Sequence, residues 1–319
     1  MTDLIFIFLF LPIALIAYWV SSPKIRQYVL LFFNFLFYIG YSAKFTILFF
    51  ISLVINIVLM KILSDPSRKI LFRRALLIAG IILNLIPLIY FKYSGFAMKI
   101  WNVLTDGNAG IVEMAAPIGI SFYVFKAISL LVDVYRGTSA PGVADAAVYL
   151  SFFCQMVSGP ISRVSDMTDS PVCRYSVKND GSEVFSFLSP GMVLFVTGLS
   201  KKILIANVLE NIVSEVFTDI SAVENTGAFL LWVGSVCYSL QLFVDFSGYS
   251  DMAIGVSKMF GFKCPENFIY PYMTKSFSEF WRRWHISLGT WFKDYVYIPL
   301  GGSRGGGAQQ LETCLLSGF

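Results

Sequence analysis

Long stretches without a charged residue constrain this chain more than any other feature of its sequence. Residues 4–20, 45–60 and 75–91 contain no Asp, Glu, Lys or Arg. Each run approaches the length of about 20 residues that crosses a bilayer as a helix. Of the 319 residues only 14% are charged and 56% are hydrophobic, whereas about 25% of the residues of a soluble domain are charged. The core of a soluble domain could not bury several such uncharged runs. The sequence therefore predicts an integral membrane protein.

Further apolar runs follow along the chain, and some of them include polar residues. We predict eight or nine membrane segments in total, mostly helical because backbone groups in lipid must be satisfied within the segment. The first run lacks a basic start and ends in an interfacial Tyr18-Trp19 pair, so we interpret it as a retained anchor and not a signal peptide. The other candidates are residues 28–43, 115–132 (with Lys126), 145–161, 184–200, 203–217 (with two Glu) and 226–244.

Basic residues are unevenly shared among the short connections, and this bias predicts the orientation. The connection after the first run has Lys24 and Arg26, and residues 61–74 have five basic residues against one Asp. The connection between them has only Lys44. We expect a multi-pass protein of the bacterial inner membrane with its N-terminus outside.

Composition also excludes some classes of protein. The net charge of +4 reflects the loops, and the basic residues are not interleaved with aromatic residues as in nucleic-acid-binding proteins. The five Cys form no CxxC pair and no metal-like spacing. We expect no nucleic-acid partner, no disulfide framework and no metal site.

The only histidine, His285, is the strongest candidate for chemistry. Ser276-x-x-Glu279 forms a capping box, which predicts the start of a helix that carries this histidine. On that helix Trp281 and His285 share one face with Leu288 and Phe292. An imidazole between aromatic side chains stays neutral near neutral pH and is available as a base. The alternative is a structural histidine that is hydrogen-bonded in a polar pocket.

Residues 241–251 bring polar groups into an apolar segment. Gln241 and Asp245 share a helical face, and a carboxylate at this depth requires a partner or a wet cavity. Gly248 permits a break, so the segment is predicted to turn back inside the membrane. Two interpretations of Asp245 stay open: it orients His285 or binds acceptor hydroxyls, or it forms an ion pair with one of the arginines at positions 282 and 283.

Three other segments are irregular. Residues 162–183 form the longest hydrophilic stretch and are predicted to be a polar surface loop. Pro117 and Gly119 suggest a kinked or re-entrant helix, in which Lys126 requires a partner. Residues 291–307 contain Pro299 and a glycine-rich run, which is either a flexible cytoplasmic loop or a contact for a phosphate-bearing acyl donor.

Several of these segments resemble the membrane-bound O-acyltransferase (MBOAT) family, and within it the alginate O-acetyltransferase branch. The blocks run in family order over about two-thirds of the chain. The final Tyr-Ile-Pro-Leu-Gly-Gly favours the polysaccharide-acetylating branch over the relatives that transfer D-alanine to teichoic acid. The matching blocks are Pro117-Ile-Gly-Ile-Ser-Phe-Tyr, Leu131-Val-Asp-Val-Tyr-Arg-Gly, Ser158-Gly-Pro-Ile, Lys201-Lys-Ile, Asp245-Phe-Ser-Gly-Tyr-Ser-Asp-Met-Ala-Ile-Gly, Pro265-Glu-Asn-Phe, Phe280-Trp-Arg-Arg-Trp-His-Ile-Ser-Leu and Tyr297-Ile-Pro-Leu-Gly-Gly.

The resemblance implies an all-α fold in which the helices surround a central tunnel and some segments are re-entrant. Residues 1–319 are then a single MBOAT transmembrane domain, in which residues 276–307 form a re-entrant signature helix and a glycine-rich loop. Family members are usually longer and carry a second histidine after the glycine-rich loop, so we expect a chain truncated before that histidine.

The resemblance also implies a reaction. An acyl group, most simply acetyl, passes from a cytoplasmic donor such as acetyl-CoA or an acyl carrier to hydroxyls of an exported polysaccharide or to a periplasmic acetyl-transfer protein. The chain binds no resident cofactor, and lipid surrounds it. D-alanyl transfer to teichoic acid, an acyl-group channel and an inactive scaffold are the alternatives. We expect His285 to be catalytic, and the expected substrate-binding residues are Gln241, Asp245, Trp281, Arg282, Trp284 and Ser287.

Overall fold

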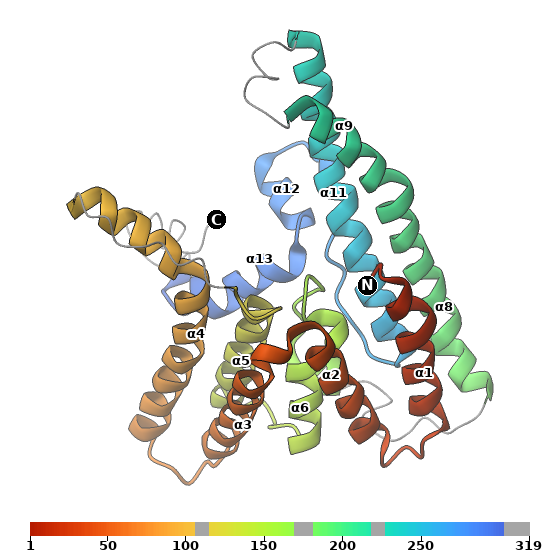
Figure 1. Cartoon of the computed structure of the whole chain (residues 1–319). Helices are drawn as coiled ribbons and strands as arrows, with labels where there is room; N and C mark the ends of the chain where they lie inside the picture. The colour runs from red at the N-terminus through yellow and green to blue at the C-terminus, as the bar shows by residue number, and fades with distance from the viewer. Residues whose placement is uncertain (106–114, 169–180, 218–226, 303–319) are drawn as a thin grey trace. The chain divides into compact units, whose positions relative to one another are not determined.

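The computed structural model describes residues 1–105, 115–168, 181–217 and 227–302 (Figure 1). In these ranges the secondary structure is helical and contains no strand, which confirms the all-α prediction. The chain divides into two compact units, which we describe separately. Unit 1 comprises the described residues within Met1–Ser22, Ser158–Pro160 and Ser170–Thr290, and unit 2 comprises those within Pro23–Val157, Ile161–Asp169 and Trp291–Phe319.

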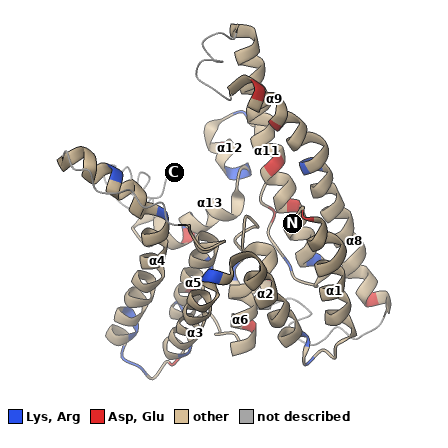
Figure 2. Ribbon diagram, viewed as in Figure 1, with Lys and Arg blue, Asp and Glu red and all other residues tan. Residues whose placement is uncertain are grey.

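The nine apolar runs predicted from the sequence all contain helix. Figure 2 shows how few charged residues interrupt the long helices. The run over residues 145–161 differs, because its α-helix ends at Ser151 and irregular backbone follows. Four helical stretches of the described residues are long and apolar enough to cross a membrane, and the number of crossings stays a prediction. They are Arg26–Leu63, Ile70–Thr105, Gly181–Phe217 and Ala228–Met259.

Unit 1 is built around a pair of antiparallel helices, α8 and α11 (Figure 1). Small residues let the two backbones touch, as is usual for helices packed in membranes. A Cβ added at Gly198 would lie 2.4 Å from the carbonyl oxygen of Gly248, and one at Gly191 would lie 2.7 Å from that of Gly255. The helices of this unit are η1 (Phe6–Phe10), α1 (Leu11–Val20), α8 (Gly181–Ser200), η4 (Lys201–Ala206), α9 (Asn207–Phe217), α11 (Ala228–Met259), η5 (Pro271–Met273), α12 (Phe277–Arg283) and α13 (Ile286–Phe292), the last of which continues into unit 2 after Thr290.

Gly248 therefore has a different role from the predicted one. Helix α11 continues through it without a break, so the prediction that residues 241–251 turn back inside the membrane is wrong. The glycine is needed for close approach to α8 and not for a turn.

Unit 2 contains buried amides that pair across its helices. The Asn56 and Asn84 side chains each donate to the other's oxygen, at 3.0 and 2.8 Å, and Asn56 also contacts the Tyr123 hydroxyl at 3.1 Å. Such pairs satisfy polar groups that lipid cannot. Its helices are α2 (Arg26–Ser42), η2 (Ala43–Phe45), α3 (Thr46–Leu63), α4 (Ile70–Thr105), α5 (Ile120–Tyr135), α6 (Val143–Ser151), η3 (Phe153–Gln155), α7 (Val164–Thr168) and η6 (Lys293–Tyr297).

The predicted partner of Lys126 is present in unit 2. Its ammonium donates to Gln155 Oε1 at 2.8 Å and lies 4.6 Å from the centre of the Tyr149 ring. The kink expected from Pro117 and Gly119 is absent, because α5 begins only at Ile120. Gly119 precedes the helix with φ 69°, and a Cβ there would lie 2.2 Å from the Met156 carbonyl oxygen, so the turn requires glycine.

The predicted polar loop over residues 162–183 is only partly described. Its first residues differ from the expectation, since Ser162, Val164 and Met167 are buried and α7 forms there. Residues 169–180 lie outside the described part of the chain, as do residues 303–307 of the glycine-rich run.

We predict that Gly198→Ala destabilises unit 1. The added methyl group forces the backbones of α8 and α11 apart, an overpacking defect that costs about 1–3 kcal/mol. The matched control is Gly95→Ala in α4, where an added Cβ meets nothing within 4 Å. Thermal unfolding in detergent is expected to show a lower Tm for the first variant and an unchanged or higher Tm for the second, and equal Tm values for both would contradict the packing described.

Candidate active site

His285 lies at a break between two short helices of unit 1. Helix α12 ends at Arg283, Trp284 is extended with φ −101° and ψ 127°, and His285 has φ 44°. The capping box is confirmed, because Ser276 Oγ accepts from the Glu279 amide at 3.2 Å. The single helix through His285 is wrong, and with it the shared face of Trp281, His285, Leu288 and Phe292.

Asn267 satisfies the backbone groups that this break exposes. The first amides of a helix have no partner within it. At the start of α13 the Ile286 amide donates to the Asn267 carbonyl oxygen at 3.0 Å, and the Ser287 amide donates to Asn267 Oδ1 at 3.2 Å. The Ile269 amide in turn donates to the Arg283 carbonyl oxygen at 3.1 Å. The segment after α11 thus holds both sides of the break.

Within the part of the chain that the structure describes, the imidazole of His285 has one polar contact and aromatic neighbours. Its Nδ1 lies 3.0 Å from Asn267 Oδ1. The Phe246 ring meets it edge to face with centroids 4.8 Å apart, and the Phe268 ring lies parallel to it at 6.4 Å. The predicted aromatic surroundings of the histidine are present, although different rings supply them.

Burial lowers the pKa of His285 from its ordinary value of 6.5 to about 4. The charged form loses hydration in this pocket, and no carboxylate pairs with the ring among the described residues. The ring is therefore neutral near neutral pH, so one of its two nitrogens has a free lone pair.

Asp245 pairs with a residue that the sequence reasoning did not consider. Its Oδ1 lies 2.5 Å from Lys202 Nζ, and neither Arg282 nor Arg283 is its partner. A second ion pair joins Lys201 Nζ to Asp251 Oδ2 at 2.6 Å. Both lysines lie at the start of the π-helical turn η4, and both aspartates lie on α11.

The other predicted substrate-binding residues occupy different environments. Gln241 has a buried Oε1 without a hydrogen-bond partner in the described structure, and Ser287 is buried with its Oγ donating to Asn267 Oδ1 at 2.9 Å.

Trp284 stacks on Phe280 with centroids 5.5 Å apart. Trp281 and Arg282 are exposed, and the aromatic contacts of Trp281 are with Phe277 and Phe280. The structure thus brings Ser287 and His285 together through Asn267, and places the other predicted residues outside that hydrogen-bonded group.

Asn267 is the residue that sequence reasoning missed. It belongs to the Pro265-Glu-Asn-Phe block, where Pro265 and the absence of helical periodicity indicate only an irregular segment. Its separation of 18 residues from the histidine gives no helical or strand register that links the two. The only signal available from the sequence was a polar amide side chain in an irregular segment.

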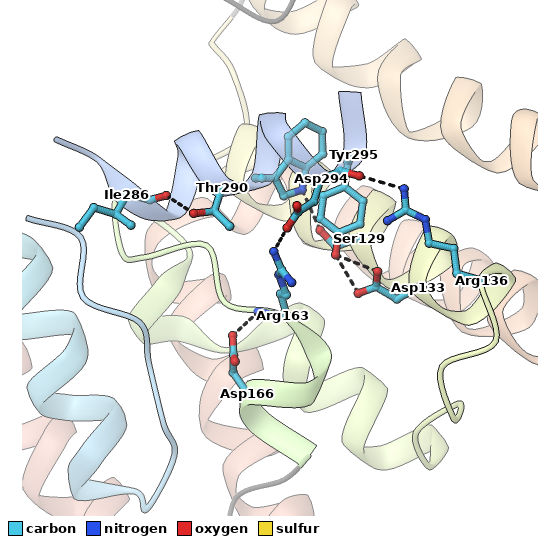
Figure 3. Close-up of polar contacts among 10 residues, drawn as sticks. Ser129, Asp133, Arg136, Arg163, Asp166, Ile286, Thr290, Asp294 and Tyr295 are labelled. Carbon is cyan, nitrogen blue, oxygen red and sulfur yellow. Dashed lines mark hydrogen bonds and ion pairs between the residues drawn. The ribbon is translucent and has the colours of Figure 1, made fainter. Parts of the chain in front are cut away.

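A second polar group, in unit 2, anchors the sequence that follows the signature (Figure 3). The Tyr295 hydroxyl contacts both carboxylate oxygens of Asp133, at 2.9 and 2.8 Å. The Asp294 carboxylate forms an ion pair with Arg163, and its backbone oxygen accepts from Arg136 at 2.8 Å. These contacts fix η6 against α5 and the start of α7.

The sequence profile of the membrane-bound O-acyltransferase family matches residues 33–319. Since that match covers most of the chain, the chain belongs to this family. Together with the long apolar helices, the family identifies a multi-pass membrane protein.

Three relatives indicate where the chain lies within the family. It is 38% identical over 309 residues to the probable alginate O-acetylase AlgI of Pseudomonas syringae. The matched region covers 95% of this chain and 57% of the Pseudomonas protein. It is 31% identical over 332 residues to the peptidoglycan O-acetyltransferase of Helicobacter pylori, with 94% and 61% covered. The teichoic acid D-alanyltransferase of Bacillus subtilis is 29% identical over 223 residues, with 69% and 53% covered. The chain spans about three-fifths of the length of the curated acetyltransferases that it matches.

We predict that His285 titrates near pH 4 in the folded protein. The folded chain binds this proton less readily than the unfolded chain, so stability falls as the pH decreases from 6.5 towards about 4. As the chain has one histidine, labelling histidine with ¹⁵N gives one imidazole to follow by NMR. A midpoint near 6.5 would contradict the burial described.

We predict that Tyr295→Phe destabilises unit 2 by about 1–3 kcal/mol, because it leaves a half-buried carboxylate without its hydrogen bonds. Tyr297→Phe is the matched control, since no hydrogen bond of Tyr297 is described. Thermal unfolding of the two variants in the same detergent separates the outcomes, and a Tyr295→Phe variant as stable as the control would refute the anchoring role.

Proposed function

We propose that the protein is a membrane O-acyltransferase that moves an acetyl group to hydroxyls of an exported polysaccharide. The observation that carries this proposal is the neutral, partly buried imidazole at a helix break in a chain of the MBOAT family. A neutral imidazole accepts a proton without first losing one, as a general base must.

In the proposed reaction His285 removes the proton of the acceptor hydroxyl. The hydroxyl oxygen bonds to the acyl carbon, and the bond between that carbon and the donor's leaving atom breaks. The leaving group then takes the proton from the imidazolium, which restores the neutral base. General base catalysis contributes about 10²–10⁴-fold to such a rate.

The unpartnered Gln241 Oε1 supports a contact with the acceptor. A buried acceptor atom without a donor costs free energy, and a substrate hydroxyl would offset that cost. Gln241 lies one helical turn before Asp245 on α11, so a hydroxyl-bearing ligand meets both groups on one face. Trp281, Arg282, Trp284 and Ser287 are proposed to complete the binding surface.

The donor and the topology follow from the same proposal. Acetyl-CoA or a carrier-linked acyl group reaches the protein from the cytoplasm of a bacterial cell, and the N-terminus lies outside the inner membrane. The basic connections after the first and third apolar runs support this orientation. The acceptor is the polysaccharide itself or a periplasmic acetyl-transfer protein that passes the group on.

An acetyl group is favoured over D-alanine as the cargo. The relatives named as acetylases or acetyltransferases cover 95% and 94% of this chain, whereas the D-alanyltransferase covers 69%. Assays with both kinds of donor distinguish the two.

The experiment is to express the protein in a host that makes the polysaccharide, and to compare wild type with His285→Ala. We predict that the variant reaches the membrane in equal amount and that polysaccharide acetylation falls by at least about 10²-fold, the usual worth of a general base. Gly95→Ala is the control for insertion and should acetylate as the wild type does. Acetylation that persists in His285→Ala would refute the proposed role and would favour an acyl channel.

A further inference from the structure

Three groups of the histidine segment converge on the side-chain oxygen of Asn267. They are His285 Nδ1 at 3.0 Å, the Ser287 amide nitrogen at 3.2 Å and Ser287 Oγ at 2.9 Å. Asn267 is only 1% exposed, so water does not compete for these contacts. These contacts determine the position of the ring and also which of its nitrogens carries the proton.

The Ser287 amide identifies the atom that faces it. A backbone N–H only donates, so the Asn267 atom within 3.2 Å of it is the carbonyl oxygen and not the amide nitrogen. A carbonyl oxygen only accepts. His285 Nδ1 must then carry the hydrogen of the bond that joins it to the same oxygen.

A neutral imidazole carries one proton, and which nitrogen holds it is set by the hydrogen bond of the other. With the hydrogen on Nδ1, the lone pair of Nε2 is free. Burial beside the rings of Phe246 and Phe268 disfavours a second proton, because the charged imidazole would lose hydration there.

We infer that Asn267 is a positioning residue that holds His285 as the Nδ1–H tautomer and thereby presents Nε2 as the proton acceptor. The role of Nε2 rests on the proposed function, whereas the tautomer does not. When Nε2 takes the proton of the acceptor hydroxyl, the Nδ1–H bond to Asn267 becomes charge-assisted and strengthens, which favours the charged state that the reaction passes through.

The single histidine makes the tautomer directly measurable. In the purified 319-residue chain, labelled with ¹⁵N-histidine, the two ring nitrogens of His285 are the only signals of their kind. We expect a protonated Nδ1 and an unprotonated Nε2 at neutral pH. A spectrum of the Nε2–H tautomer in the wild type would overturn the inference without any variant.

Variants then test whether Asn267 is the cause. Asn267→Ala removes the acceptor, so the population moves towards the Nε2–H form, whereas Asn267→Asp retains an acceptor and should retain the Nδ1–H form. Ser287→Ala removes only the hydroxyl donor, and the amide still orients the oxygen, so the tautomer should not change. Asn34→Ala is the matched control, because this buried amide bonds Ser151 in unit 2. An unchanged tautomer in a folded Asn267→Ala chain would contradict the role.

Activity separates this inference from the proposed function. In an acetylating enzyme, Asn267→Ala should lower kcat by roughly 10-fold or more with little change in the KM for the acceptor, and Asn267→Asp should recover part of the loss. If His285→Ala retains acetylation, the proposed function fails and the tautomer result stands. If His285→Ala abolishes acetylation but the wild type has the Nε2–H form, the inference alone fails.

Discussion

The bonds between Asn267 and the first amides of α13 are the contacts on which the candidate site depends. A helix that stops and restarts leaves amide groups without a partner inside the helix, and other parts of the chain must accept their hydrogen bonds where they are buried. Here one residue accepts from two of them, the Ile286 amide through its backbone and the Ser287 amide through its side chain. His285 can adopt φ 44° at the break because its neighbours are held on both sides. The interruption of the helix turns the imidazole towards the asparagine.

Charged residues in the remainder of unit 1 also form pairs. Lys201 and Lys202 meet Asp251 and Asp245 next to the place where Gly198 and Gly248 bring two backbones into contact. The four charged side chains are 22–42% exposed, so solvent still reaches both ion pairs. Asp245 is thus held by a lysine, and a substrate hydroxyl that reaches it would meet an ion pair and not an isolated carboxylate.

Much of this architecture was predictable from sequence, since it depends on composition and on local pattern. The uncharged runs predicted the helices, and the capping box of Ser276 and Glu279 predicted the start of α12. The partners of Asp245 and His285 were not predictable, because each comes from a segment that is distant in sequence and has no register with it. The continuous pattern around His285 predicted one helix. Local periodicity does not reveal the break, because hydrogen bonds from a segment distant in sequence stabilise it.

The central claim is that Asn267 sustains the break at His285, and hydrogen exchange of single amides tests it most directly. The Ser287 amide should exchange slowly in the wild type and much faster in Asn267→Ala, because it donates to the side-chain oxygen that this substitution removes. The Ile286 amide should remain protected in both, since it donates to the Asn267 backbone. Equal exchange of the Ser287 amide in the two proteins would contradict the account.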